Sequence, residues 1–272
     1  MNQDQQDRSK RFRALHECEG AFIIPNPWDA GSARALAGLG FEALATTSSG
    51  LAFVFGRSDG AVTREEHLAH IRDLVAATPL PVSADLENCY SDDPALAAMT
   101  IRMASEAGAS GCSIEDFSSH PGGKIYDFDH AVERVVAAVE VARALPIPFV
   151  LTARAENLIR GRDDLDDTIK RLQAFEKAGA DVLYAPGLKT AEEVARVCSA
   201  VSMPVNVLAT AALSVADISA AGGKRISVGG ALARVAIGGF LDAAKLMADE
   251  GTFAAFGEAP GFGVINGLID RS

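Results

Sequence analysis

Short apolar runs alternate with amphipathic stretches of helical periodicity along this chain. The alternation is typical of repeated βα units, in which each buried strand of a parallel sheet is followed by a helix that covers it. It predicts eight strands, at Ala21–Pro25, Ala43–Thr47, Val82–Asp85, Gly111–Glu115, Phe149–Arg154, Val182–Ala185, Val205–Leu208 and Arg225–Val228.

Glycine and proline alternate as the residues that separate these units. Glycine precedes the even-numbered strands, where the preceding helix can end in a left-handed conformation that is easiest without a Cβ atom. Proline precedes the third, fifth and seventh strands, since a residue without an N–H group fits the first position of a strand. The residues are Gly40, Gly108, Gly179 and Gly222, with Pro81, Pro148 and Pro204. Their regular recurrence predicts an α/β fold, a closed single (β/α)8 TIM-type barrel.

The length of the chain fits one such barrel. With 272 residues, 49% of them hydrophobic, it can bury one large core, and barrels of about this length commonly form one domain. We expect a single domain over residues 1–272, with the barrel at about 20–238. The C-terminal extension, 239–272, should carry an extra helix near Phe240–Ala248 that packs beneath the barrel or reaches a neighbouring subunit.

Charge and cysteine usage exclude several functional classes. A net charge of -11 and a pI near 4.9 argue against nucleic acid or an anionic membrane as a partner. The segment Met1–Arg13 is polar, and no apolar run approaches the roughly 18 residues of a spanning helix, so a cytoplasmic protein is expected. No C-x-x-C pair suggests zinc or disulfides, and nothing predicts a reactive thiol at Cys89. The cysteines are Cys18, Cys89, Cys112 and Cys198.

Acidic residues stand at the C-terminal ends of the third and fourth strands, where barrels of this type form their active sites. Asp85 and Glu87 are two residues apart, so an extended backbone would turn both inward, with Glu115 at the same height on the next strand. Three close carboxylates would raise one another's pKa unless a cation separated them. Such hard oxygen ligands favour Mg²⁺, with Mn²⁺ as the alternative. Each acid alone could instead be a solvated loop residue.

Further polar groups reach the same end of the predicted barrel. Arg154 ends a buried strand, where its guanidinium needs an anionic partner, either a substrate group or an acid such as Glu156. An internal ion pair that braces the barrel is the alternative. The Ser49-Gly50 turn offers backbone N–H groups and a hydroxyl for a carboxylate or phosphonate. Asn206 brings an amide from the seventh strand.

The segment Phe117–Lys124, after the fourth strand, is small, polar and rich in glycine. Such a segment suits a lid that closes over a substrate, or an ordinary mobile loop. His120 is the only histidine near a strand end, so it is an acid/base candidate, with Ser119 beside it. His67 and His70 lie on a predicted helix and are expected at the surface.

Taken in order, these motifs resemble the isocitrate lyase/phosphoenolpyruvate mutase superfamily. The resemblance covers nearly the whole chain, through Asn26-Pro27-Trp28-Asp29-Ala30, Ser49-Gly50-Leu51, Asp59, Asp85-Leu86-Glu87, Ser113-Ile114-Glu115-Asp116, Thr152-Ala153-Arg154 and Gly229-Gly230. It implies a barrel, a tetramer with an exchanged C-terminal helix, and Mg²⁺-assisted making or breaking of C–C or P–C bonds in 2-oxo or 2-hydroxy acids.

The resemblance also implies roles for individual residues. The metal and its waters would be held by Asp85, Glu87 and Glu115, the substrate carboxylate by Ser49, Gly50 and Leu51, and the developing enolate by Arg154, while Asp59 matches a site carboxylate of the mutase branch. Two departures stand out. Glu87 replaces the usual aspartate, and its longer side chain would reach the metal through water. The isocitrate lyases carry a Lys-x-Cys-Gly-His lid with a proton-donating cysteine, where this chain has Ser118-Ser119-His120.

The leading hypothesis is a Mg²⁺-dependent lyase that cleaves a C–C bond of a small 2-oxo or 2-hydroxy acid, similar to an oxaloacetate decarboxylase or a methylisocitrate or malate lyase. His120, Ser119 or water would supply the final proton. The alternatives are a phosphonopyruvate-type mutase or hydrolase, similar to carboxyphosphonoenolpyruvate phosphonomutase, and a non-catalytic 2-oxo acid binder. A Schiff-base aldolase is disfavoured, because Lys224 precedes the eighth strand and no lysine ends one. Gly229-Gly230 fits either a phosphate site or close helix packing.

Overall fold

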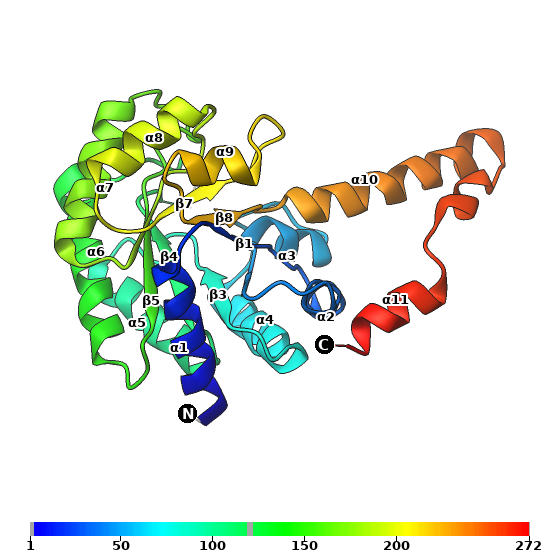
Figure 1. The fold of residues 1–272 in the computed structure, drawn as a ribbon, viewed down its shortest axis with the longest axis horizontal. Coiled ribbons are helices and arrows are strands. Elements are labelled where there is room, and N and C mark those ends of the chain that lie inside the picture. Colours follow the sequence, from blue (N-terminus) through cyan, green and yellow to red (C-terminus); the bar gives the residue numbers. More distant parts are fainter. Residues whose placement is uncertain (1–2, 119–121, 272) are drawn as a thin grey trace.

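Eight parallel strands curve into a nearly closed barrel in the computed structural model (Figure 1), which describes residues 3–118 and 122–271. Within these residues the strand order is β1-β8-β7-β6-β5-β4-β3-β2. The strands are β1 Phe22–Ile24, β2 Leu44–Ala45, β3 Val82–Asp85, β4 Gly111–Glu115, β5 Val150–Arg154, β6 Val182–Tyr184, β7 Val205–Leu208 and β8 Arg225–Ser227. Each lies inside its expected range, so the predicted TIM-type barrel is confirmed.

Helices follow the strands and cover the outside of the barrel (Figure 1). The main core lies between the outer faces of the strands and these helices. Several helices begin at a capping box, as α4 does at Thr63 and Glu66, which satisfies N–H groups that have no partner within the helix. The helices are α1 Gln3–Glu17, α2 Ala30–Gly38, α3 Ser48–Val54, α4 Arg64–Ala77, α5 Pro94–Glu106, α6 Phe128–Ala144, α7 Leu165–Ala178, α8 Ala191–Ala200, α9 Val215–Ala220, α10 Ala231–Lys245 and α11 Phe262–Ile269.

The glycines expected at the helix ends have the conformation that their position requires. Gly40, Gly108, Gly179 and Gly222 have φ angles of 90°, 104°, 102° and 92°. These values lie in the left-handed region, where a Cβ atom is strained. The prediction that these four glycines adopt a left-handed conformation at helix ends is therefore confirmed.

Helix α1 fills the N-terminal end of the barrel. Phe12 is fully buried among Ile24, Val150 and Val182. A Cβ atom on Gly111 would lie 2.8 Å from the Phe12 ring, so the strand approaches the ring closely only because residue 111 is glycine. The interior of the barrel can therefore open only at the C-terminal ends of the strands.

Asn26 joins the two strands at the seam of the barrel. Between β1 and β2 the Ala45 N–H donates to the Pro25 carbonyl at 3.1 Å, and the Asn26 Nδ2 donates to the Thr46 carbonyl at 2.8 Å. The Oδ1 of the same side chain accepts from the N–H groups of Val228 and Gly229, both at 2.9 Å. One amide thus links β1, β2 and the loop after β8.

The C-terminal extension forms an arm, here defined as residues 231–271. Its helix α10 begins at Ala231, not near Phe240 as expected, because the last helix of the barrel runs on into the extension. A π-helical turn (Leu246–Glu250) and a 3-10 turn (Ala254–Glu258) follow. The chain then doubles back, and α11 packs on α2 (Figure 1). None of the helices in the described ranges is long and apolar enough to span a membrane.

Candidate active site

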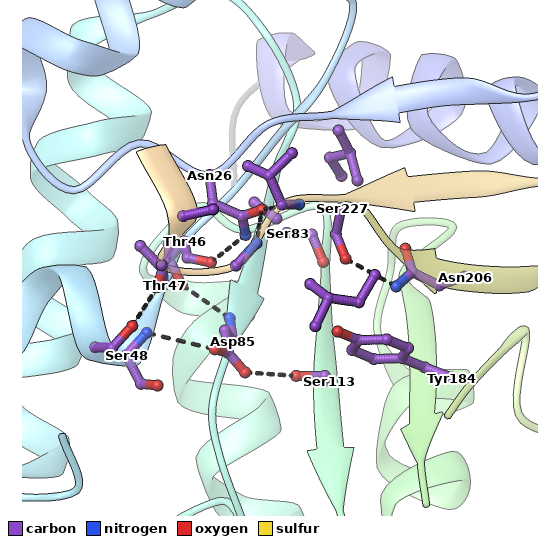
Figure 2. A pocket seen from close by; sticks show the side chains of 18 of the residues that line it. Asn26, Thr46, Thr47, Ser48, Ser83, Asp85, Ser113, Tyr184, Asn206 and Ser227 are labelled. Atoms are coloured by element: carbon purple, nitrogen blue, oxygen red, sulfur yellow. Dashed lines mark hydrogen bonds between the residues drawn. The ribbon is translucent and has the colours of Figure 1, made fainter. Parts of the chain in front are cut away.

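A cavity of about 390 Å³ lies at the C-terminal ends of the strands (Figure 2). Both charged and hydroxyl side chains line it, from nearly every strand of the barrel. Its polar lining consists of Asn26, Thr46, Thr47, Ser48, Ser49, Asp59, Ser83, Asp85, Ser113, Arg154, Tyr184, Asn206, Arg225, Ser227 and Arg234. A polar interior of this kind is suited to a small charged ligand.

Asp85, at the end of β3, is held from several sides (Figure 2). Its Oδ1 accepts from the Ser113 hydroxyl and from Arg154 Nη1, both at 3.2 Å. Its Oδ2 accepts from the Ser48 N–H at 3.3 Å, and its own N–H donates to the Thr46 hydroxyl at 2.8 Å. The carboxylate is therefore fixed in orientation before any ligand binds.

His67 contacts the Thr46 hydroxyl that accepts from the Asp85 N–H. It is fully buried, so the expectation that it lies at the surface is wrong. Its Nε2 lies 3.2 Å from the Thr46 hydroxyl and its Nδ1 lies 2.6 Å from the Tyr90 hydroxyl. Burial lowers the pKa of His67 to about 4, so the ring is neutral at pH 7. His70 is buried too, because α4 packs on the sheet through the face that carries both rings.

Arg154 lies among three acids. Its Nη1 is 3.3 Å from a Glu115 carboxylate oxygen, in addition to its contact with Asp85, and its Nε forms a close ion pair with Glu156. Glu156 is fully buried and also accepts from Arg160 Nε at 3.0 Å. The guanidinium therefore has internal partners, Glu156 among them as expected, while it still lines the cavity.

The three predicted metal ligands lie at different depths relative to the cavity: Asp85 lines it, whereas Glu87 and Glu115 do not. Glu87 has a left-handed φ of 53°, so the inward alternation expected after Asp85 stops there. In the register of β3 and β4, Asp85 lies opposite Ser113, so Glu115 lies two residues beyond it along β4. The Glu115 N–H donates to the Glu87 carbonyl. Asp85 lines the cavity, but Glu87 and Glu115 are set back from it. Across residues 3–118 and 122–271, no three His, Cys, Asp or Glu side chains are arranged to hold a metal ion directly.

Asp59 contributes a second carboxylate to the rim of the cavity. The Ser48 hydroxyl donates a hydrogen bond to it. Partial burial raises the pKa of Asp59, and the negative charge of Asp85 adds to this effect. Asp59 and Asp85 therefore face the same cavity, which Arg154 lines as well.

The Ser49-Gly50-Leu51 segment is the first turn of α3 rather than an open turn. Ser49 lines the cavity. Gly50 and Leu51 are buried, and their N–H groups donate to the side chain and carbonyl of Thr47 at 3.3 and 3.1 Å. A Cβ atom on Gly230 would lie 2.4 Å from the Ser49 hydroxyl. Of the three predicted carboxylate contacts, only Ser49 faces the cavity.

Asn206 lies in the cavity wall as expected, but its amide already has two partners. Its Nδ2 donates to the Ser227 hydroxyl at 2.9 Å and its Oδ1 accepts from Arg225 Nε at 2.8 Å. Arg225, Ser227 and Tyr184 also line the cavity and were not predicted from the sequence. A charged or hydroxyl residue at every second position of a buried strand is the signal that could have found them.

Four further residues considered in the sequence remain, of which the structure describes Cys89 and Lys224. Ser119 and His120 lie outside the described residues. Cys89 is buried, and burial raises its pKa to about 12, as expected for an unreactive thiol. Lys224 donates to the Gly20 carbonyl at the N-terminal end of the barrel, away from the site.

The family model described as phosphoenolpyruvate phosphomutase matches residues 12–248. A crystal structure of a candidate lyase/mutase from Burkholderia cenocepacia is 57% identical, with a TM-score of 0.94 over 97% of this chain and 96% of that chain. A 2-methylisocitrate lyase from Halalkalibacterium halodurans is 31% identical over 74% of this chain and 67% of the relative. An oxaloacetate decarboxylase from Paraburkholderia xenovorans is 29% identical over 72% of this chain and 67% of the relative.

Proposed function

Because the chain belongs to the phosphoenolpyruvate phosphomutase family, within the isocitrate lyase/phosphoenolpyruvate mutase superfamily, we propose that it is a Mg²⁺-dependent lyase that cleaves a C–C bond of a small 2-oxo or 2-hydroxy carboxylic acid. The observation that carries this proposal is the fixed Asp85 carboxylate at the cavity wall, in contact with Arg154. The named relatives that act on methylisocitrate and oxaloacetate support the substrate class.

The residues at the cavity fit a hard divalent cation. Asp85 and Asp59 offer oxygen ligands, and Arg154, which also contacts Glu115 and Glu156, cannot neutralise all the nearby acids. Asp85 would bind Mg²⁺ or Mn²⁺ directly, while Glu87 and Glu115, set back from the cavity, would bind the waters of the ion. When bound, the ion draws electron density from the substrate oxygens and so stabilises an enolate.

The side chains of this chain would orient the substrate and stabilise its charge. The Ser49 hydroxyl would donate to the substrate carboxylate, and Arg154 would stabilise the negative charge that develops as the bond breaks. Glu115 and Glu156 hold the guanidinium in place for this role. Asn206 would contact the substrate from the opposite wall. His120 or Ser119 stays the predicted proton donor, with water as the alternative.

Product analysis tests the lyase proposal. Purified protein should be incubated with oxaloacetate, malates, citramalates and 2-methylisocitrate, each with Mg²⁺ and with excess EDTA. ¹H NMR should show cleavage of at least one substrate only when Mg²⁺ is present. Turnover that is equal with EDTA, or absent from every substrate, would contradict the proposal.

A second candidate is cleavage or rearrangement of a P–C bond, which the description of the matching family model favours. The same cavity acids and Arg154 would serve a phosphonopyruvate-type mutase or hydrolase. Incubation with phosphonopyruvate followed by ³¹P NMR separates the two, because only this activity yields a new phosphorus signal. Tight binding of 2-oxo acids without turnover would instead indicate a binder.

The arm supports a proposed homotetramer. Phe240, Phe253 and Phe262 are 69%, 61% and 88% exposed, and such large exposed apolar groups favour burial against another subunit. Light scattering after size-exclusion chromatography would test this assembly. We propose that the enzyme acts in the cytoplasm on a small-molecule acid, without a nucleic acid or membrane partner.

A further inference from the structure

Arg225 is a second cavity arginine with surroundings unlike those of Arg154. It begins β8, its side chain points into the barrel, and it lines the cavity while only 5% exposed. We propose that Arg225 forms an anion-binding subsite for a second carboxylate of the substrate, distal to the one that binds near Ser49. This inference rests on the proposed function and narrows its substrate class to dicarboxylic acids.

The hydrogen bonds of Arg225 leave part of its guanidinium unused. Its Nε donates to the Asn206 Oδ1 at 2.8 Å. Its Nη1 is buried and has no hydrogen-bond partner in the described part of the chain, and no ion pair found there includes Arg225. A buried guanidinium without an acid is costly, and a ligand carboxylate would supply the missing charge and acceptor atoms.

Among the residues that the structure describes, the ionisable groups that interact with Arg225 carry no negative charge at neutral pH. His16, on α1, is neutral because burial, reinforced by the charge of Arg225, lowers its pKa to about 3. Lys224 is a cation. Burial raises the pKa of the Tyr184 phenol. Burial lowers the pKa of Arg225 itself, but only to about 10, so it stays charged at neutral pH. The positive charge at this wall is therefore uncompensated, whereas Arg154 contacts three acids.

The hydroxyl groups beside Arg225 can complete the subsite. The Ser227 hydroxyl accepts from Asn206 and shares a hydrogen bond with the Tyr184 hydroxyl. Whichever of these two hydroxyls donates to the other, one hydroxyl hydrogen stays available. Ser227 and Tyr184 both line the cavity (Figure 2). A carboxylate that accepts from Arg225 could therefore accept from a hydroxyl as well.

Malate and lactate test the subsite, since both are 2-hydroxy acids and malate carries the additional carboxylate. Isothermal titration calorimetry with Mg²⁺ should show that the wild type binds malate at least tenfold more tightly than lactate. Arg225→Met should weaken malate binding at least tenfold and leave lactate binding within twofold. Arg234→Met removes an exposed cavity arginine and should leave the malate-to-lactate ratio unchanged.

Two outcomes would overturn the subsite. One is equal binding of malate and lactate by the wild type, which needs no variant. The other is an Arg225→Met protein that loses both ligands equally or has a clearly lower Tm, because these results indicate a structural brace. The proposal expects an unchanged or higher Tm without ligand, since the variant removes a buried unpaired cation. If this variant does not fold, Arg225→Lys should retain the malate preference.

Binding is measured here without turnover, so the two proposals can fail separately. A malate preference that depends on Arg225 would support the subsite even if no lyase activity were found. Lyase activity without a preference for diacids would retain the proposed function and overturn the subsite.

Discussion

Arg154 Nη1 lies 3.2 Å from the Asp85 Oδ1 and so joins the ends of β5 and β3. The same guanidinium contacts Glu115 and Glu156. One cation therefore fixes the acid that lines the cavity together with two acids set behind it. A substitution at Arg154 or Asp85 should therefore change both the stability of the barrel and its catalytic activity.

Arg154→Gln should lower the free energy of unfolding by about 3 kcal/mol, because it leaves buried carboxylates without their main cation. Urea unfolding at pH 7 would measure the change. Arg64→Gln is the matched control, since Arg64 pairs with the exposed Glu65 at the surface. The control should show no measurable change. Equal effects of the two substitutions would contradict the bracing role.

Asp85→Asn keeps the shape of the side chain and removes its charge. We expect kcat/KM to fall by about 100-fold or more, and a higher Mg²⁺ concentration for half-maximal activity. Steady-state kinetics over a Mg²⁺ titration would show both. Asp93→Asn is the control, because Asp93 caps α5 on the surface and asparagine caps equally well. An active Asp85→Asn enzyme would exclude Asp85 as a metal ligand.

Buried histidines should make the fold sensitive to acid. Burial lowers the pKa of His16 to about 3 and that of His70 to about 4. The folded protein keeps these rings neutral while the unfolded chain binds protons below about pH 6.5. Stability should therefore be fully present above pH 6.5 and decline as the pH falls toward 4.

His70→Gln isolates one of these groups. The free energy of unfolding of the variant should fall less steeply between pH 6 and 4.5, by up to about 1.4 kcal/mol per pH unit. Urea unfolding at several pH values would measure both slopes. The variant and the wild type should have the same slope above pH 7.5. If the free energy of unfolding fell with the same slope in the variant and the wild type throughout the acid range, His70 would not contribute to the acid sensitivity.

Gly38→Ala should release α11 from α2. A Cβ atom on Gly38 would lie 2.1 Å from the Leu268 carbonyl oxygen, and a backbone atom cannot move aside alone. We expect faster hydrogen exchange in α11, measured by mass spectrometry. Gly267→Ala is the control in the same helix, because nothing lies within 4 Å of a Cβ atom there. Unchanged exchange in Gly38→Ala would show that α11 adapts.

The strands could be predicted because hydrophobic periodicity, and the glycine or proline that precedes a strand, can be read from neighbouring residues. Val82–Asp85 and Gly111–Glu115 are apolar runs between a helix end and a polar loop, and the structure has both strands at these bounds. Helix α1 had no such signal, since its sequence is mostly polar and several of its buried residues, such as Ser9 and His16, are polar as well. Its position depends on the fit of the Phe12 ring against Gly111, which is a tertiary contact.

The site was harder to predict because side-chain direction after a strand depends on the turn. The positions of Asp85 and Arg154 follow from strand alternation. The direction of Glu87 does not, since its left-handed backbone breaks the alternation. Arg225 was missed for another reason. A charged residue at the start of a strand suggests solvent, and only the closed barrel places it inside.

The hydrogen bonds of Asn26 affect the order in which the barrel can form as the chain is synthesised. Its Oδ1 accepts from the N–H groups of Val228 and Gly229, and β1 pairs with β8 in the same region. A nascent chain lacks these partners until nearly all of the barrel has left the ribosome, because synthesis proceeds from the N-terminus. Until then β1 and β7, the two strands that pair with β8, each have an unpaired edge. Closure of the barrel and completion of the cavity wall are therefore one late event in folding.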